Sequence, residues 1–307
     1  MNGAALRRGF GVWALLFVIF LPQTGAAEGR QEAEEDPEDA VDPLLISPFQ
    51  WQELLRGELR PNGALTRGSL LVAPAFPLVA ERHIAVTLLP SYRFDRLQAN
   101  GITDSESLHR FELGTFIGVQ ISSAWALDID LRAVYAGALD EHYSEGWYPN
   151  LRFAANWAIS RDFTASISAL WTRTGLGLIP VPLFGVYYHP EGVPLRIDAL
   201  LPRYVEVAVP FGNAEVFVMG HWESHVWSLT NGEARGDLLT RQEIRAQLGV
   251  RARVFGPLAI EISGQWIPFQ QIELGSRSSS PASLDDFSLT VNVVLDKVVA
   301  RQAFLAP

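Results

Sequence analysis

Residues 243–254, with the sequence EIRAQLGVRARV, decide the fold. Every second residue of this stretch is apolar, and the positions between are charged residues, an amide or a glycine. The apolar set is Ile244, Ala246, Leu248, Val250, Ala252 and Val254, and the other set is Glu243, Arg245, Gln247, Gly249, Arg251 and Arg253. Successive side chains of a β-strand point to opposite faces, so this period of two predicts a strand with one apolar and one polar face.

The same alternation recurs through most of the chain and predicts twelve strands. Most of these segments are longer than the roughly 5 to 6 residues usual in water-soluble proteins. They reach the roughly 9 to 11 residues that a tilted strand needs to cross a bilayer. The predicted strands are residues 82–96, 107–122, 125–138, 148–160, 162–174, 182–188, 194–201, 203–210, 214–224, 241–255, 258–269 and 286–296.

The connections between these strands alternate in length. The short ones are residues 123–124, 161–162, 189–193, 211–213 and 256–257. The longer ones are residues 98–106, 139–147, 175–181, 225–240 and 270–285, and only the connection near Pro202 departs from the alternation. Short periplasmic turns and longer external loops are typical of bacterial outer-membrane barrels, and an even strand number leaves both termini in the periplasm.

Over residues 68–307 these features resemble Gram-negative outer-membrane β-barrel proteins. The segment from Pro180 to Pro202 is similar to the core of a family within that class whose function is unassigned. The resemblance implies an all-β fold, a transmembrane antiparallel up-and-down barrel of about 12 strands. The count could fall to ten, because six prolines remove ladder donors from the middle strands, or residues 69–76 could join; the possible range is 10 to 14 strands. The chain departs from the class at its end, which is Phe304-Leu305-Ala306-Pro307 rather than an aromatic residue.

The N-terminal region predicts export. Arg7 and Arg8 precede an apolar run over residues 10–21 and the small residues at 25–27, the order of a secretory signal, although an uncleaved anchor is the alternative. We expect a signal peptide at residues 1–27, an acidic disordered segment at 28–46, a short helix and periplasmic lead-in at 47–67, and the barrel at 68–307. Together with the resemblance, this predicts the cell outer membrane.

Composition excludes several other classes. The chain has no cysteine, which excludes disulfides, thiolate metal sites and cysteine nucleophiles. Its 34 acidic and 24 basic residues give a formal charge of -10, so nucleic acid is not an expected partner. The expected partners are outer-membrane lipid and the barrel-assembly machinery, the expected state is a monomer, and no cofactor is expected.

The polar faces of the strands predict a charge-lined lumen, because a barrel of this width is not filled by side chains as easily as one of eight strands. The predicted lumen-lining residues are Arg110, Glu112, Asp128, Asp130, Arg132, Arg152, Glu243, Arg245, Arg251 and Arg253. Aromatic residues toward strand ends predict interface girdles. They are Trp125, Tyr135, Trp157, Trp171, Trp222 and Trp266.

The main functional hypothesis is a porin-like channel or passive transporter for small polar solutes, with Arg245, Arg251 and Arg253 facing anionic solutes. A closed lumen cross-braced by salt bridges explains the same residues equally well. An outer-leaflet lipid-modifying hydrolase is the minority alternative, because His142 and Ser144 have the His-x-Ser spacing of lipid A deacylases. A structural or adhesive barrel without transport is the third. No catalytic or metal-binding residue is assigned, although His221, Glu223 and His225 share one face and could hold a divalent cation.

Overall fold

The computed structural model describes residues 51–60, 66–81, 83–97, 106–137, 146–174, 177–228, 238–274, 277–278 and 286–296. Contacts separate residues 1–38 and 307 from a unit formed by residues 39–306, and every described strand belongs to that second unit. Within the described ranges the structure is all β, and no helix has the length and apolarity to span a membrane.

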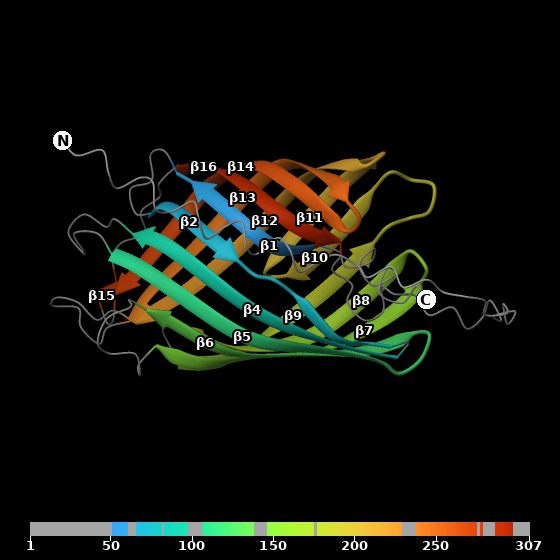
Figure 1. The fold of residues 1–307 in the computed structure, drawn as a ribbon, viewed down its shortest axis with the longest axis horizontal. Coiled ribbons are helices and arrows are strands. Elements are labelled where there is room, and N and C mark those ends of the chain that lie inside the picture. Colours follow the sequence, from blue (N-terminus) through green and yellow to red (C-terminus); the bar gives the residue numbers. More distant parts are fainter. Residues whose placement is uncertain are drawn as a thin grey trace, which may run out of the picture. The chain divides into compact units, whose positions relative to one another are not determined.

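One sheet contains all of the strands, and neighbouring strands around the wall pair antiparallel (Figure 1). The bounds are β1 Trp51–Leu59, β2 Thr66–Val72, β3 Phe76–Ala80, β4 Ile84–Leu97, β5 Glu106–Gln120, β6 Trp125–Gly137, β7 Trp147–Ser160 and β8 Phe163–Thr174. The remaining strands are β9 Gly177–Tyr188, β10 Arg196–Leu201, β11 Tyr204–Phe211, β12 Ala214–Ser228, β13 Leu238–Phe255, β14 Leu258–Leu274, β15 Arg277–Ser278 and β16 Asp286–Asp296.

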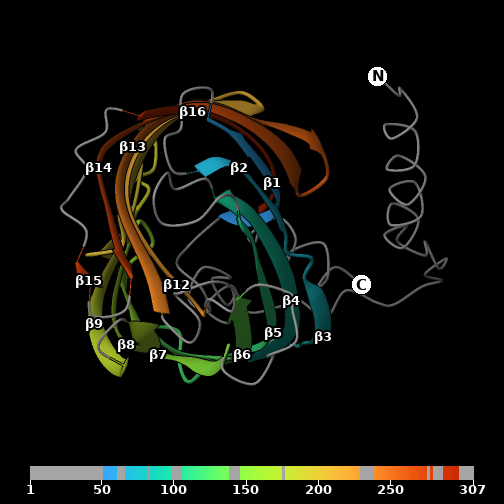
Figure 2. The ribbon, with the colours of Figure 1, turned by 90° about the vertical axis from the view of Figure 1, so that its left-hand side faces the viewer.

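The sheet closes on itself into a barrel (Figure 2). The first strand, β1, pairs with the last, β16, from Trp51 opposite Asp296 to Leu59 opposite Leu289. The short strand β3 continues the place of β2 beside β4, and β15 only extends the edge of β14. Of the 16 strands, these two add no place to the ring, so 16 − 2 = 14 strands form the wall.

All twelve predicted strands are present, and the two additional places in the wall are filled by β1 and β2. The helix predicted within residues 47–67 is wrong for Trp51–Leu59, which forms β1. A β-bulge between Glu53 and Leu55 interrupts the alternation of this strand. The interruption gives the apolar residues a spacing that imitates a helix, and the barrel therefore begins before the predicted boundary at residue 68.

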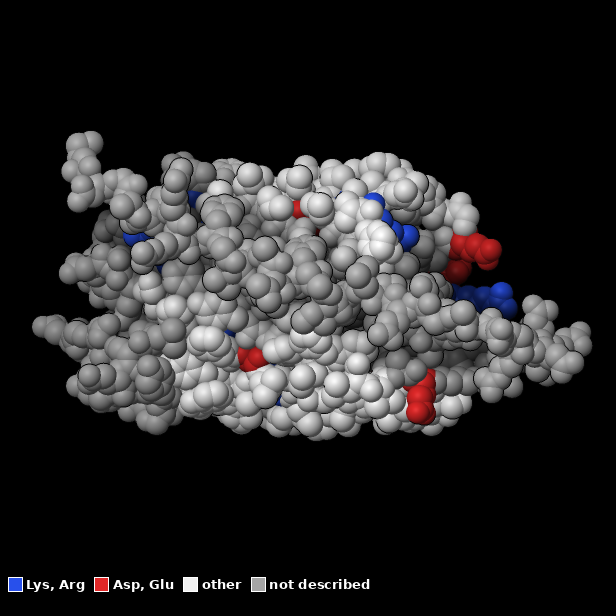
Figure 3. Space-filling view, in the orientation of Figure 1, with Lys and Arg blue, Asp and Glu red and all other residues white. Residues whose placement is uncertain are grey.

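The outer face of the wall is apolar. Leu248 has 61% of its surface exposed, and comparable side chains on neighbouring strands are also exposed, among them Leu113, Ile167, Val218, Ile262 and Leu289. Few charged side chains are visible over the middle of the barrel in Figure 3, and several gather at its right-hand end. A continuous apolar surface of this extent requires a partner or a membrane rather than water.

The two ends of the barrel differ in their connections. At one end, on the right of Figure 1, the described connections are residues 81–83, 121–124, 161–162, 189–195, 212–213 and 256–257. At the other end, five connections are longer than two residues, whereas residues 175–176 and 202–203 are two-residue connections. The long connection predicted at 175–181 is therefore wrong, because β9 already begins at Gly177.

Candidate functional site: the barrel interior

The polar face of β13 points into the barrel, where a cluster of ion pairs surrounds Arg245. This side chain is 0% exposed. Its guanidinium donates hydrogen bonds to Glu243 at 2.9 Å, Glu58 at 3.1 Å and Gln265 at 3.0 Å, and lies 3.1 Å from Glu223. The charge of Arg245 is therefore fully matched by protein groups.

The same cluster joins distant parts of the wall. Arg60 donates two hydrogen bonds to Glu243, at 3.0 and 2.9 Å. From β4, Arg93 reaches His225 of β12 at 2.9 Å, and Asp95 accepts a bond from Arg241 of β13 at 3.5 Å. We call this group the cross-barrel cluster; it comprises Glu58, Arg60, Arg93, Asp95, Glu223, Arg241, Glu243 and Arg245.

A second group, the β10–β14 cluster, lies nearer the end with short connections. It comprises Arg196, Glu206, Glu215, Arg251 and Glu261. Arg251, only 4% exposed, bonds to Glu206 at 3.1 Å and Glu261 at 2.7 Å, contacts Glu215, and lies 4.6 Å from the ring centre of Phe217. Arg196 contacts Glu206 and donates a hydrogen bond to Glu215 at 2.8 Å. Arg251 is therefore occupied by carboxylates, as Arg245 is.

The third arginine of the predicted ladder has different surroundings. The Arg253 side chain is 42% exposed and forms an ion pair with Asp296 at 2.5 Å. Glu243, also predicted to line the lumen, lies in the cross-barrel cluster. The ladder on β13 is therefore not a row of unpaired cations available to solutes, because the structure brings a carboxylate to each of its arginines.

The inward side chains of β5–β8 differ in exposure: Asp128, Asn156 and Ser166 are buried, whereas Arg132 is open. Arg132 bonds to Asp130 at 2.8 and 2.7 Å and to Glu112 at 3.0 Å, and its side chain remains 30% exposed. Arg110 bonds to the same glutamate at 2.5 Å, and Arg152 lies 3.7 Å from Asp128. Water therefore reaches Arg132 inside the barrel, although it does not reach Arg245.

Sequence reasoning did not single out Arg203, which lies in the turn between β10 and β11. Its side chain is exposed, and the charges of Arg132, Arg152 and Glu223 act on it. Among the described residues, no carboxylate forms an ion pair with Arg203. Arg203 lies in a turn, where the sequence does not alternate, so the sequence pattern could not mark it. Only the folded barrel brings Arg203 near Arg132 and Arg152.

The end of β12 narrows the interior at the end with long connections. Ser228 pairs in parallel with Gly137 at the end of β6, six places away around the ring. The two backbones approach so closely that a Cβ on Gly137 would lie 2.9 Å from the Ser228 carbonyl oxygen. Trp227 is buried beside this contact and lies under the guanidinium of Arg241, 5.2 Å from its ring centre.

The predicted girdle residues lie in three kinds of surroundings. Trp125, Trp157 and Trp266 are exposed, and the first two stack with ring centres 5.5 Å apart at the end with short connections. Tyr135 is buried within a row of rings toward the opposite end, between Phe111 at 6.2 Å and Trp147 at 5.6 Å. Trp171 and Trp222 are half-buried.

The candidate cation site on β12 is dominated by positive charge. Glu223 lies between His221 and His225, at 3.5 and 3.3 Å. Arg56 at 3.3 Å and Arg245 at 3.1 Å also contact the same carboxylate, so a divalent cation would meet two guanidinium groups. In the described ranges, no group of three or more His, Asp or Glu residues could hold a metal ion. His142 and Ser144 lie outside the described residues.

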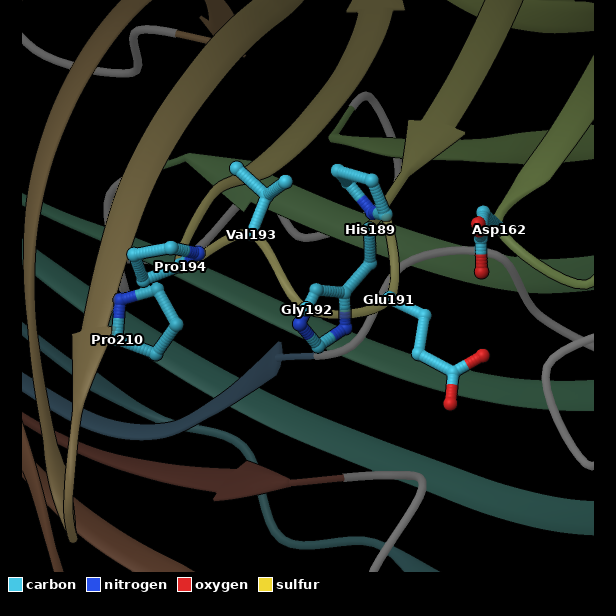
Figure 4. A pocket seen from close by; sticks show the side chains of 8 residues that line it. Asp162, His189, Glu191, Gly192, Val193, Pro194 and Pro210 are labelled. Carbon is cyan, nitrogen blue, oxygen red and sulfur yellow. The ribbon is translucent and has the colours of Figure 1, made fainter.

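A surface pocket lies outside these clusters, at the end with short connections (Figure 4). The β9–β10 turn supplies most of its lining, and Asp162 and Pro210 complete it. His189 donates its backbone N–H to the Asp162 carbonyl at 2.9 Å, so the pocket is bounded by ordinary turn contacts. It carries no arrangement of groups that indicates a ligand.

No protein-family model matches the chain, and no characterised protein matches it in sequence. Its structure is similar to the KdgM porin, with TM-score 0.36 and 5% identity over 78% of this chain and 96% of that one. The NanC porin gives TM-score 0.36 and 9% identity over 80% and 99% of the two chains. Outer membrane phospholipase A from Escherichia coli gives TM-score 0.38 and 11% identity over 84% and 100%. These solved structures are outer-membrane β-barrel proteins, and at such scores neither a porin's solutes nor a phospholipase's activity is carried over to this chain.

Proposed function

We propose that the chain is an outer-membrane β-barrel that passes small polar solutes passively along the half of its interior lined by β5–β8. The contrast in exposure between inward arginines supports this most directly. Arg132 is 30% exposed inside the wall, whereas Arg245 and Arg251 are buried in ion-pair clusters. Solutes need a wetted path, and of these three arginines Arg132 is the one that water reaches.

Membrane placement rests on the outer face of the barrel. Exposed apolar side chains cover strands on both sides of the molecule, and their charged neighbours in sequence point inward. Hydrocarbon is the environment in which this arrangement is stable, because a closed barrel leaves few backbone groups unpaired there.

The charges along β5–β8 indicate what such a path would select. Arg110, Arg132 and Arg152 alternate with Glu112 and Asp130, so both signs line the same wall. A mixed lining produces a field across the path rather than a net attraction for one sign. We therefore expect weak ion selectivity instead of the anion preference that an unpaired arginine ladder would give.

Single-channel recording in planar bilayers tests the proposal. The chain has no cysteine, so Arg132→Cys introduces one unique thiol. A charged methanethiosulfonate reagent should react with it and reduce the conductance. The matched Gln247→Cys variant should not change, since that side chain is buried and bonded to Glu261 and Ser263. A folded protein without conductance at any voltage would discard the channel and favour a braced, closed interior.

A further inference from the structure

The ladder of the wall is interrupted above the short hairpin formed by β10 and β11. On its β10 side, β9 is paired only from Phe184 onward, opposite Leu201. On its β11 side, β12 is paired as far as Trp222, whose N–H donates to the Arg203 carbonyl at 2.8 Å. Among the described strands, residues 177–183 of β9 and 223–227 of β12 thus have no wall partner on these sides, and Ser228 pairs instead with Gly137 of β6. We call this interruption the seam.

The β9 edge of the seam lacks most of its hydrogen-bond donors. His189 donates to Asp162 on the β8 side, and residues two apart in a strand direct their N–H the same way. With no register shift along β9, even-numbered residues direct their nitrogen toward the seam. These are Leu178, Pro180 and Pro182, of which only the first has an N–H. The edge is therefore poorly suited to pair with another strand and less costly to leave unpaired in a membrane.

Inside the seam, the barrel wall is apolar. Leu183, only 2% exposed, packs with the buried Leu200 of β10, and both contact a partly buried set. That set consists of Leu170, Val181 and Tyr204. Most other inward faces of the strands carry charged, hydroxyl or amide groups. This patch is therefore a local apolar lining inside the barrel, next to the apolar outer face of β9.

Positive charge lies at the base of the seam. Arg203 forms the tip of the β10–β11 hairpin, is exposed, and has no ion-paired carboxylate among the described residues. The charges of Arg132, Arg152 and Glu223 act on it, so two like charges and one carboxylate lie in its surroundings. An apolar patch beside a guanidinium group that makes no ion pair among the described residues complements an amphiphile with an anionic head.

We propose that the seam is a lateral portal through which an anionic phospholipid of the surrounding membrane enters the barrel interior. The acyl chain lies against the partly buried Leu170 and Val181, which pack on the buried Leu183, and the phosphate lies at Arg203. This inference goes beyond solute passage and shares with it only the placement in a membrane. Addition of a peptide strand is the competing use of an open edge, and the two prolines disfavour it.

Fluorescence quenching in phosphatidylcholine vesicles tests the portal. Val181→Cys carries a bimane label, and the vesicles contain doxyl-labelled phosphatidylglycerol or doxyl-labelled phosphatidylcholine at equal mole fraction. We expect stronger quenching by the anionic lipid, with an apparent preference of about fivefold, which corresponds to about 1 kcal/mol for one arginine at an anionic lipid. Arg203→Gln should remove the preference. Leu170→Cys provides a second reporter if the first variant does not fold.

Two matched positions calibrate the result. A label at Leu248→Cys, on the outer face, should be quenched equally by both lipids, and one at Gln247→Cys should be quenched by neither. Quenching at position 181 no stronger than at 247 would overturn lipid entry, and equal quenching by the two lipids would overturn recognition of the head. Disulfide-linked dimers of Leu178→Cys without quenching would assign the edge to strand addition. Conductance of the same proteins is recorded separately, so a failed portal leaves the channel proposal standing.

Discussion

Arg251 and Arg253 share one strand and one parity, yet their environments differ. Arg251 is buried among three carboxylates, and Arg253 is partly exposed with one. Arg251→Met leaves Glu206 and Glu215 with Arg196 and removes the arginine that pairs with Glu261, so we expect a loss of about 3 to 5 kcal/mol of unfolding free energy. Arg253→Met should cost less, because it removes the partner of one carboxylate, Asp296, rather than of three. Urea unfolding in lipid vesicles, followed by tryptophan fluorescence, measures both. Equal losses would contradict the clusters.

On the opposite face of the same strand, Leu248 tests the lipid contact. Placing a charged side chain at the bilayer midplane costs about 2 to 4 kcal/mol. Leu248→Arg should therefore lower the unfolding free energy or block insertion, whereas Leu248→Ala removes the same contacts without adding charge. A protein that loses no more stability with arginine than with alanine would place this face in water.

Parity alone predicts that residues such as Arg245 and Leu248 point to opposite sides, because a strand alternates strictly. It does not predict the partners of Arg245. Glu58 comes from a strand that the sequence pattern does not show, and Glu223 lies on β12, whose register with β13 fixes the pairing. The face to which Arg245 points was thus predictable, and the carboxylates that pair with it were not.

At the scale of elements, β1 is decisive, because it closes the ring and supplies Arg56 and Glu58 to the interior, and Arg60 follows its last residue. Its register predicts a cross-link. Leu59 and Leu289 stand directly opposite each other, and directly opposite positions bring side chains close enough for a disulfide. Leu59→Cys/Leu289→Cys should form one spontaneously and keep the barrel compact on gels after heating without reductant.

The matched control pairs Leu59→Cys with Leu248→Cys, which lies on a strand that β1 does not neighbour. That pair should remain reduced. Failure of the first pair to oxidise, with native migration retained, would contradict closure through β1. The prolines of β9 also show what the sequence could and could not predict. In the sequence they indicated a strand that lacks hydrogen-bond donors, but the open edge follows only from the short length of β10 in the folded barrel.

At the scale of the whole molecule, the ring closes between β1 and β16 but stays open at the seam between β9 and β12. A closed ring leaves no long strand edge for aggregation. The two short strands, β10 and β11, are the place where the ring is incomplete, and the end of β12 there turns toward β6. The number of strands and their order could be predicted from alternation to within the two N-terminal strands. The inward turn of β12 could not, because it depends on a backbone contact at Gly137.

The orientation of the barrel is a property of the whole molecule, and its two unlike ends predict it. Barrels in the outer membrane place short turns in the periplasm and long loops outside. A tag within residues 229–237, which join β12 to β13, should therefore be reached by antibody on intact cells. A tag at Gly256-Pro257, the turn between β13 and β14, should be reached only after the cells are permeabilised. Both tags flank the same strand, β13, so expression and insertion affect them alike. Labelling of the second tag alone on intact cells would reverse the orientation, and labelling of both would mean that β13 does not cross the membrane.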